Sequence, residues 1–165
     1  MGVFDTYPDR YLPRCNSALK TIGTEEVATA EGKFFSAFFF QTGASVSSLM
    51  ITTGTGYTPT LHTHASCDGA GSWTFAEAPE CSAGSAVTAY NMDRTSAITA
   101  SSATIVSNPT YTTTGTILSR HELPAYTGAS EMNHDRVLKA STGYIMEFTP
   151  TASARSIISF HFTED

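Results

Sequence analysis

The chain has 165 residues, which suits one domain with a core of its own. Its net charge of −6 disfavours nucleic acid as a partner, because an acidic surface repels phosphate groups. The longest apolar run, residues 34–40, is too short to span a bilayer, and the first residues lack the basic-then-apolar pattern of a secretion signal, so we expect no membrane partner.

Residues 1–30 are predicted to form an extended N-terminal arm. Pro8 and Pro13 punctuate this segment, and neither helical nor strand periodicity persists in it. Aromatic residues and arginine are enriched at interface hot spots, and an unattached tail would not normally carry so many. We therefore predict that the arm binds a neighbouring subunit or another protein, the alternative being that it packs on its own domain. The predicted partner-binding residues are Phe4, Tyr7, Arg10, Tyr11, Leu12 and Arg14.

The arm also differs from the body of the chain in the sign of its charge. Arg10, Arg14 and Lys20 against Asp5 and Asp9 give residues 1–24 a charge of +1, which leaves −7 for the rest of the chain. Opposite signs would steer the arm towards an acidic partner surface.

From residue 32 onward, short apolar runs alternate with turn signals. Period two, in which successive side chains face opposite sides, indicates a half-buried strand. The pattern is clearest where Tyr144, Met146 and Phe148 share one face. The strands predicted in this way are 33–40, 46–52, 60–66, 72–78, 86–91, 98–106, 110–119, 144–149 and 157–163.

Short strands at regular spacing, without an internal repeat, predict an all-β fold. We expect an antiparallel, jelly-roll-like β-sandwich over residues 31–165, preceded by the arm. The turn Asp68-Gly69-Ala70-Gly71 predicts a hairpin between the strands at 60–66 and 72–78. Phenylalanines on both faces of 34–40 indicate a strand covered on both sides, and we expect a homo-oligomer, a trimer or a dimer, to supply part of that cover.

His62 and His64 form the most suggestive short motif. Two residues apart in a strand, they point to one face and could reach one metal. With Gly56 and Asp68 they resemble part of a cupin motif, but the Glu, the later Gly and the second motif of that pattern are missing. In the expected hairpin, Glu77 would complete a His-His-Glu trio. The alternative, that these are polar neighbours on a solvated face, is the one we adopt, so no metal or other cofactor is expected.

No sequence feature establishes a catalytic site. There is no nucleophile elbow, phosphate-binding loop or dinucleotide fingerprint. His121 and His134 fall in a segment expected to be a surface loop. Cys67 and Cys81 are expected to be too far apart for a disulfide, and an odd cysteine count favours reduced thiols. The chain is therefore not expected to be an enzyme.

The stretch 32–165 resembles a family of small tailed-phage virion proteins that often decorate the capsid. An opening Gly-Lys-Phe-Phe strand leads to Trp73-Thr74-Phe75-Ala76-Glu77, and the turn 90–96 is similar to an Asn-x-Asn-Arg-x-Ser motif, with Asp93 in place of its second Asn. Asn108-Pro109, the segment 137–144 and the aromatic, acid-ended last strand follow in the family's order, with Ala140-Ser141 in place of Pro-Asn. The resemblance implies a jelly-roll-like sandwich without catalytic residues.

The function expected from this resemblance is capsid decoration. Such a protein would be made in the host cytoplasm, bind the major capsid protein on the exterior of the virion, and stabilise the assembled shell. Two alternatives remain open from the sequence. One is a tail or fibre domain that binds a receptor or glycan, and the other is a cupin-like metalloprotein.

Overall fold

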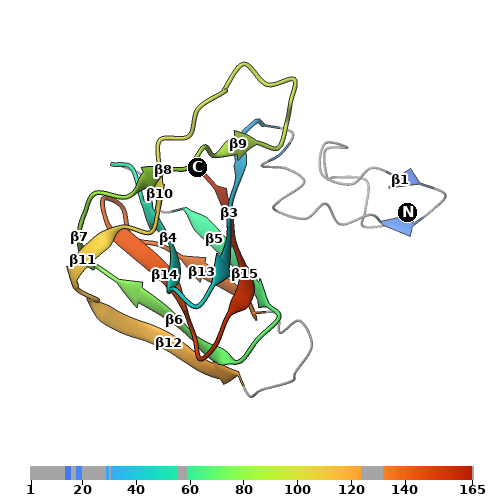
Figure 1. Ribbon diagram of the computed structural model, residues 1–165. Coiled ribbons are helices and arrows are strands. Elements are labelled where there is room, and N and C mark those ends of the chain that lie inside the picture. Colours follow the sequence, from blue (N-terminus) through green and yellow to red (C-terminus); the bar gives the residue numbers. More distant parts are fainter. Residues whose placement is uncertain are drawn as a thin grey trace.

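The computed structural model describes residues 14–15, 18–19, 29, 31–55, 59–123 and 132–164. The described residues from 31 onward form a sandwich of two antiparallel sheets (Figure 1). The five-stranded sheet has the order β13 (Met132–Val137), β5 (Thr60–Cys67), β15 (Ala154–Thr163), β3 (Phe34–Gly43) and β9 (Tyr90–Asn91). The six-stranded sheet has the order β12 (Thr116–Leu123), β6 (Gly71–Glu77), β14 (Gly143–Pro150), β4 (Ser47–Thr52), β10 (Thr104–Ser107) and β8 (Ser85–Ala86).

The eight longer strands follow jelly-roll topology. Along the chain they change sheet at every step except from β6 to β12, so that β3, β5, β13 and β15 lie in one sheet and β4, β6, β12 and β14 in the other. Their spatial orders, β13-β5-β15-β3 and β12-β6-β14-β4, are those of a double-sheet jelly roll. This confirms the prediction of an all-β, antiparallel, jelly-roll-like sandwich.

The main core lies between the two sheets. Period two places one side of every long strand inside, as the alternating burial of β5 shows. Three aromatic pairs fill the space: Phe35 with Phe162, Trp73 with Phe148, and Phe75 with Tyr144. Full burial of each such side chain contributes about 1.5–3 kcal/mol to folding. Cys67 and Cys81 are both free thiols, as expected.

A short ribbon covers part of the outer face of the six-stranded sheet. It consists of β7 (Glu80–Ser82) paired with β11 (Thr110–Thr113). Cys81 and Tyr111 of the ribbon pack against a second apolar cluster made by Met50, Ala76 and Ile145. Both faces of this sheet therefore carry buried apolar residues.

The expected hairpin between 60–66 and 72–78 is wrong. β5 and β6 lie in different sheets, and the turn between them crosses the sandwich edge. The backbone groups of this turn bond elsewhere: Asp68 N donates to Arg155 O, and Thr151 N donates to Ala70 O. A turn-rich Gly-containing link between two period-two strands suits either connection, since alternation specifies a strand's faces and not its partner.

Several strand predictions also need correction. The predicted strand 86–91 is two short strands, β8 and β9. The predicted strand 98–106 is extended only in its last residues, which belong to β10 (Thr104–Ser107). The prediction 110–119 spans β11 and β12, which separate at Gly115, a residue with φ of +75° beside the Glu77 and Ala78 backbone. β7 and β13 were not predicted, and the segment expected as a loop around His121 and His134 contains the end of β12 and the start of β13.

Candidate interaction surfaces

The outer face of the five-stranded sheet exposes aromatic side chains of β3. Phe35 and Ala37 point into the core, so Phe38 and Phe40 face outward, where 61% and 52% of their surfaces are exposed. The prediction of aromatics on both faces of this strand is confirmed. Phe35 on the inner face is part of the core, whereas Phe38 and Phe40 on the outer face are open to solvent.

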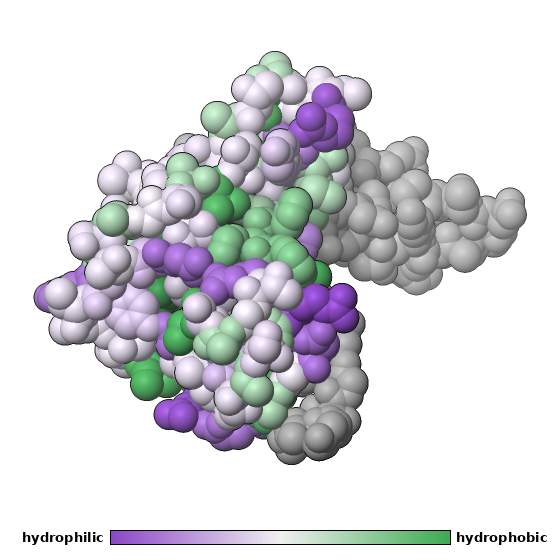
Figure 2. All heavy atoms as spheres, viewed as in Figure 1, coloured by the Kyte–Doolittle hydropathy of each residue, from purple (hydrophilic) through white to green (hydrophobic). Residues whose placement is uncertain are grey.

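The neighbouring strand extends this apolar area. Ile157 of β15 lies opposite Phe40 in the register and is 40% exposed, and Ser159 lies opposite Phe38. We call Phe38, Phe40 and Ile157 the β3–β15 patch. Hydrophobic atoms gather beside β3 in the space-filling view (Figure 2).

Among the residues whose side chains are described, the charged ones lie at the margins of this face. The Arg155 Nε donates to Asp68 Oδ2 at 2.6 Å at one end of β15, and Arg94 lies over the Tyr90 ring near β9. Between them the face carries serine, threonine and histidine around the patch. A charge-poor centre with aromatic residues is the composition of an interface core.

The geometry does not support the His-His-Glu trio. His62 and His64 do share a face of β5, and His161 of β15 lies opposite His62. Glu77, however, lies on β6 in the other sheet, where its carboxylate accepts hydrogen bonds from Lys139 Nζ and the Tyr144 hydroxyl. Within the described part of the chain, no group of three histidine, cysteine or acidic side chains is placed to hold a metal ion.

A second surface is formed by the loop of residues 90–103, which extends beyond the end of the sandwich (Figure 1). Asn91 holds its base. The buried Asn91 amide donates to Gly32 O at 2.7 Å and to Ile98 O at 2.6 Å, while its Oδ1 accepts a bond from Asp93 N at 2.9 Å. One side chain thus ties the start of the loop, its middle and the segment before β3 together.

Asp93 fixes the turn within the loop. Its Oδ1 accepts hydrogen bonds from both the backbone N and the hydroxyl of Thr95, an arrangement typical of Asx turns. The bonds from Thr95 lower the pKa of Asp93. The Ser96 hydroxyl then accepts a bond from Ile98 N. This loop makes few backbone–backbone hydrogen bonds, because its own polar side chains bond to its backbone groups instead.

Glu164 closes the far end of the loop. Its Oε1 accepts bonds from the Ser101 hydroxyl at 2.5 Å, Ser102 N at 3.0 Å and Ala103 N at 3.1 Å. A carboxylate that collects several donors in this way anchors the chain just before β10. The loop is therefore held at both ends.

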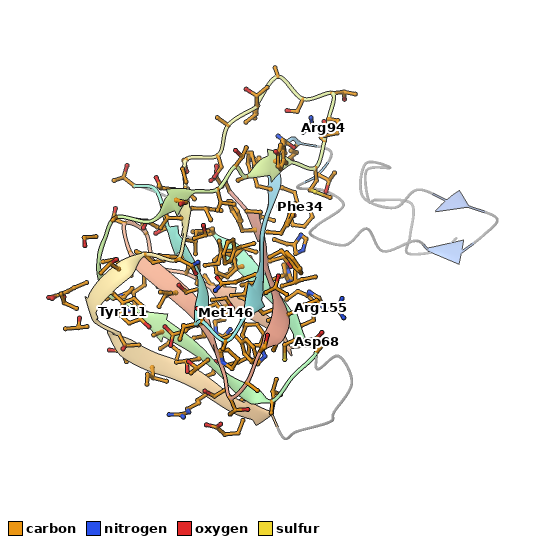
Figure 3. All side chains as sticks on the ribbon, in the orientation of Figure 1. Phe34, Asp68, Arg94, Tyr111, Met146 and Arg155 are labelled. Atoms are coloured by element: carbon orange, nitrogen blue, oxygen red, sulfur yellow. The ribbon has the colours of Figure 1, made fainter. Side chains whose placement is uncertain are left out.

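Apolar side chains project from this clamped loop. Met92 is 47% exposed and Ile98 is 45% exposed, and the exposed Tyr90 ring lies at the base under Arg94. Figure 3 shows Arg94 on the loop and Phe34 at the start of β3 below it. We call Met92 and Ile98 the loop tip. Apolar groups on a fixed backbone suit protein binding, because little ordering entropy is lost on contact.

The predicted partner-binding residues of the arm lie almost wholly outside the described residues. Phe4, Tyr7, Arg10, Tyr11 and Leu12 belong to the undescribed segment. Arg14 is the first residue of β1 (Arg14–Cys15), which pairs with β2 (Ala18–Leu19) as a separate two-stranded sheet. Their role in partner binding stays a prediction.

Sequence reasoning missed Arg136, which joins the two sheets at one edge of the sandwich. Its guanidinium lies 4.3 Å from the centroid of the Phe75 ring, and its Nη2 donates to the Ser119 hydroxyl at 2.8 Å. Burial lowers the pKa of this group. An arginine in an unpredicted edge strand carried no sequence signal for such a position.

Comparison of the chain with family models, curated proteins and solved structures found no match. In the described residues, no helix has the length and apolar content needed to cross a bilayer.

Proposed function

We propose that this chain is a structural protein of a tailed-phage particle that decorates the exterior of the capsid. It acts by protein–protein contact with the major capsid protein and has no catalytic role. The observation that carries the proposal is the 90–103 loop, which Asn91 and Glu164 hold in place while Met92 and Ile98 stay exposed. A rigid apolar projection at the end of a jelly roll suits attachment to a folded protein surface.

The residues behind the family resemblance support this assignment. Asn91, Asp93 and Ser96 of the Asn-x-Asn-Arg-x-Ser-like turn all make hydrogen bonds that shape the loop. The resemblance and the exposed surface therefore coincide in one element. The motif has a physical meaning here, which is to preorganise the apolar tip.

Decoration would stabilise the shell through mass action. A protein that binds the assembled shell and not its dissociated subunits shifts the equilibrium towards the shell. An oligomer that contacts several capsid subunits adds avidity without stronger individual contacts.

The first test is the amount and position of the protein in purified particles. Quantitative mass spectrometry and a low-resolution particle map should show many copies on the head surface. A few copies at the tail would contradict decoration and favour the receptor-binding alternative.

The second test concerns the loop tip. Met92→Ser combined with Ile98→Ser should weaken binding to undecorated particles at least tenfold, or about 1.4 kcal/mol, because the apolar contact is lost. The matched control is Ile117→Ser with Leu118→Ser, which removes two exposed apolar side chains from β12. Equal binding by the loop-tip variant and the wild type in a sedimentation assay would refute this contact.

A further inference from the structure

The β3–β15 patch is exposed on the described sandwich, and its size indicates what kind of group covers it. Each aromatic side chain offers about 150–250 Å² for burial. With Phe38 and Phe40 somewhat more than half exposed and Ile157 less than half, the patch amounts to roughly 300 Å². A stable interface between two folded domains buries about 800 Å² on each partner. A peptide segment fits the patch better than the flat face of a second sandwich.

The chain itself contains a segment of matching chemistry. Residues 1–24 hold Phe4, Tyr7, Tyr11 and Leu12, the apolar anchors that an aromatic patch accepts. The same segment has a charge of +1 against −7 for the rest of a chain with net charge −6. Charge attraction would therefore bring it to the body of the protein, and the apolar anchors would hold it there.

The connection between this segment and the sandwich is long enough to span the length of a strand. The β1–β2 ribbon is a sheet of its own and pairs with no strand of the sandwich. From Leu19 to Thr29 the chain can extend about 33 Å, as far as the ten-residue β3 itself. Phe38 and Phe40 are exposed on the described sandwich. The arm of a second copy can supply the segment that covers these side chains.

We propose that residues 1–24 of one copy bind the β3–β15 patch of a neighbouring copy and so hold a homo-oligomer together. The arm contributes the aromatic anchors, and the outer face of β3 and β15 contributes the charge-poor platform. The contact lies between copies of this chain and does not depend on the capsid. Exchange of an arm in this way also gives each copy both halves of the interface, which suits a closed symmetric assembly.

Photocrosslinking of the full chain tests the proposal directly. A benzophenone amino acid replaces Phe38, and the protein is mixed with an excess of ¹⁵N-labelled wild-type chain. We expect crosslinks from position 38 to labelled peptides within residues 1–24. The control places the same probe at Ile117, an exposed position on the other sheet, where no such crosslink should form. Crosslinks only to the unlabelled chain's own residues 1–24, or to no arm peptide, would overturn the proposal.

A second measurement uses the oligomer itself. Phe38→Ser with Phe40→Ser should raise the dissociation constant of the oligomer at least tenfold in analytical ultracentrifugation. Tyr7→Ser with Tyr11→Ser should have a similar effect, and Ile117→Ser with Leu118→Ser should have none. Unchanged association in both test variants would refute the contact. The loop-tip variants should lose particle binding and keep their oligomeric state. The capsid contact of the loop and the arm contact between copies can therefore be refuted independently of each other.

Discussion

At the scale of single residues, a few polar side chains replace backbone pairing in the loop that we propose to bind the shell. Gly32 shows how closely these parts fit. It has φ of +69°, and a Cβ added there would lie 2.1 Å from the Ser96 hydroxyl oxygen. Glycine is required for both reasons, conformation and space. The segment before β3 and the loop are therefore packed as one unit around the Asn91 amide.

Glu147 is a residue whose charge opposes folding. It lies half-buried on β14, where its Oε1 accepts a bond from the Thr149 hydroxyl while its Oε2 is buried without a hydrogen-bond partner. Burial raises the pKa of this carboxyl group. An acid whose pKa is higher in the folded than in the unfolded state favours folding when protonated, and that contribution is lost as the pH rises through the folded pKa.

Glu147→Gln should therefore raise the melting temperature at neutral pH, because no charge has to be buried. The difference from the wild type should shrink as the pH falls towards the unfolded-state pKa of glutamate, about 4.3. Thermal melts from pH 4 to pH 8 would measure this trend. Glu122→Gln is the matched control, since that carboxylate is exposed and paired with Arg120. A difference that stays constant over this pH range would contradict the assignment to charge burial.

At the scale of elements, the arm is expected to act separately from the sandwich. The main core is formed by residues between Phe35 and Phe162, so deletion of residues 1–24 should leave the β-sheet circular dichroism spectrum and a cooperative melt. Particle binding should fall tenfold or more, about 1.4 kcal/mol, because the oligomer contact and its avidity are lost. Circular dichroism and a particle sedimentation assay measure the two properties. A truncated chain that fails to fold would show that the arm belongs to the core.

The same scale shows how far the sequence could predict the fold. Strands with uninterrupted alternation, such as β14 and β15, were recognised because periodicity reports burial. The edge strand β13 was missed because its sequence, Met132–Val137, mixes polar and charged residues, and its pairing comes from β5. Partner choice was also beyond local reasoning. β5 and β6 follow each other along the chain, yet each pairs with strands distant in sequence.

The candidate surfaces were predictable in part. The phenylalanines of 34–40 indicated a strand with two apolar faces, and the structure assigns one face to the core and the other to the β3–β15 patch. The turn at 90–96 was noticed only through the family resemblance. The role of Glu164 depends on the end of β15 meeting residues 101–103, a contact that no local pattern encodes.

At the scale of the whole molecule, decoration predicts a concentration-dependent effect on particles. If the protein binds only the assembled shell, added protein should raise the temperature at which undecorated particles release their DNA. The stabilisation per site should reach about 2.7 kcal/mol at a free concentration one hundred times the dissociation constant. A dye-release melt at increasing protein concentration measures the shift. The loop-tip variant should require at least ten times more protein, and release temperatures independent of protein concentration would contradict the function.

The pairing of β3 with β15 has a consequence for how the protein is made. Along the chain, β3 is the first long strand of the sandwich and β15 is its last. They pair along their full length, from Phe34 with Thr163 to Gly43 with Ala154. A ribosome synthesises β3 before β15, so the aromatic strand waits without its neighbour while all the residues between the two strands are made. Its open edges and phenylalanines are exposed to other nascent chains in that interval. The sandwich can close only after β15 has been synthesised, so until then the apolar faces of β3 depend on protection from contact with other chains.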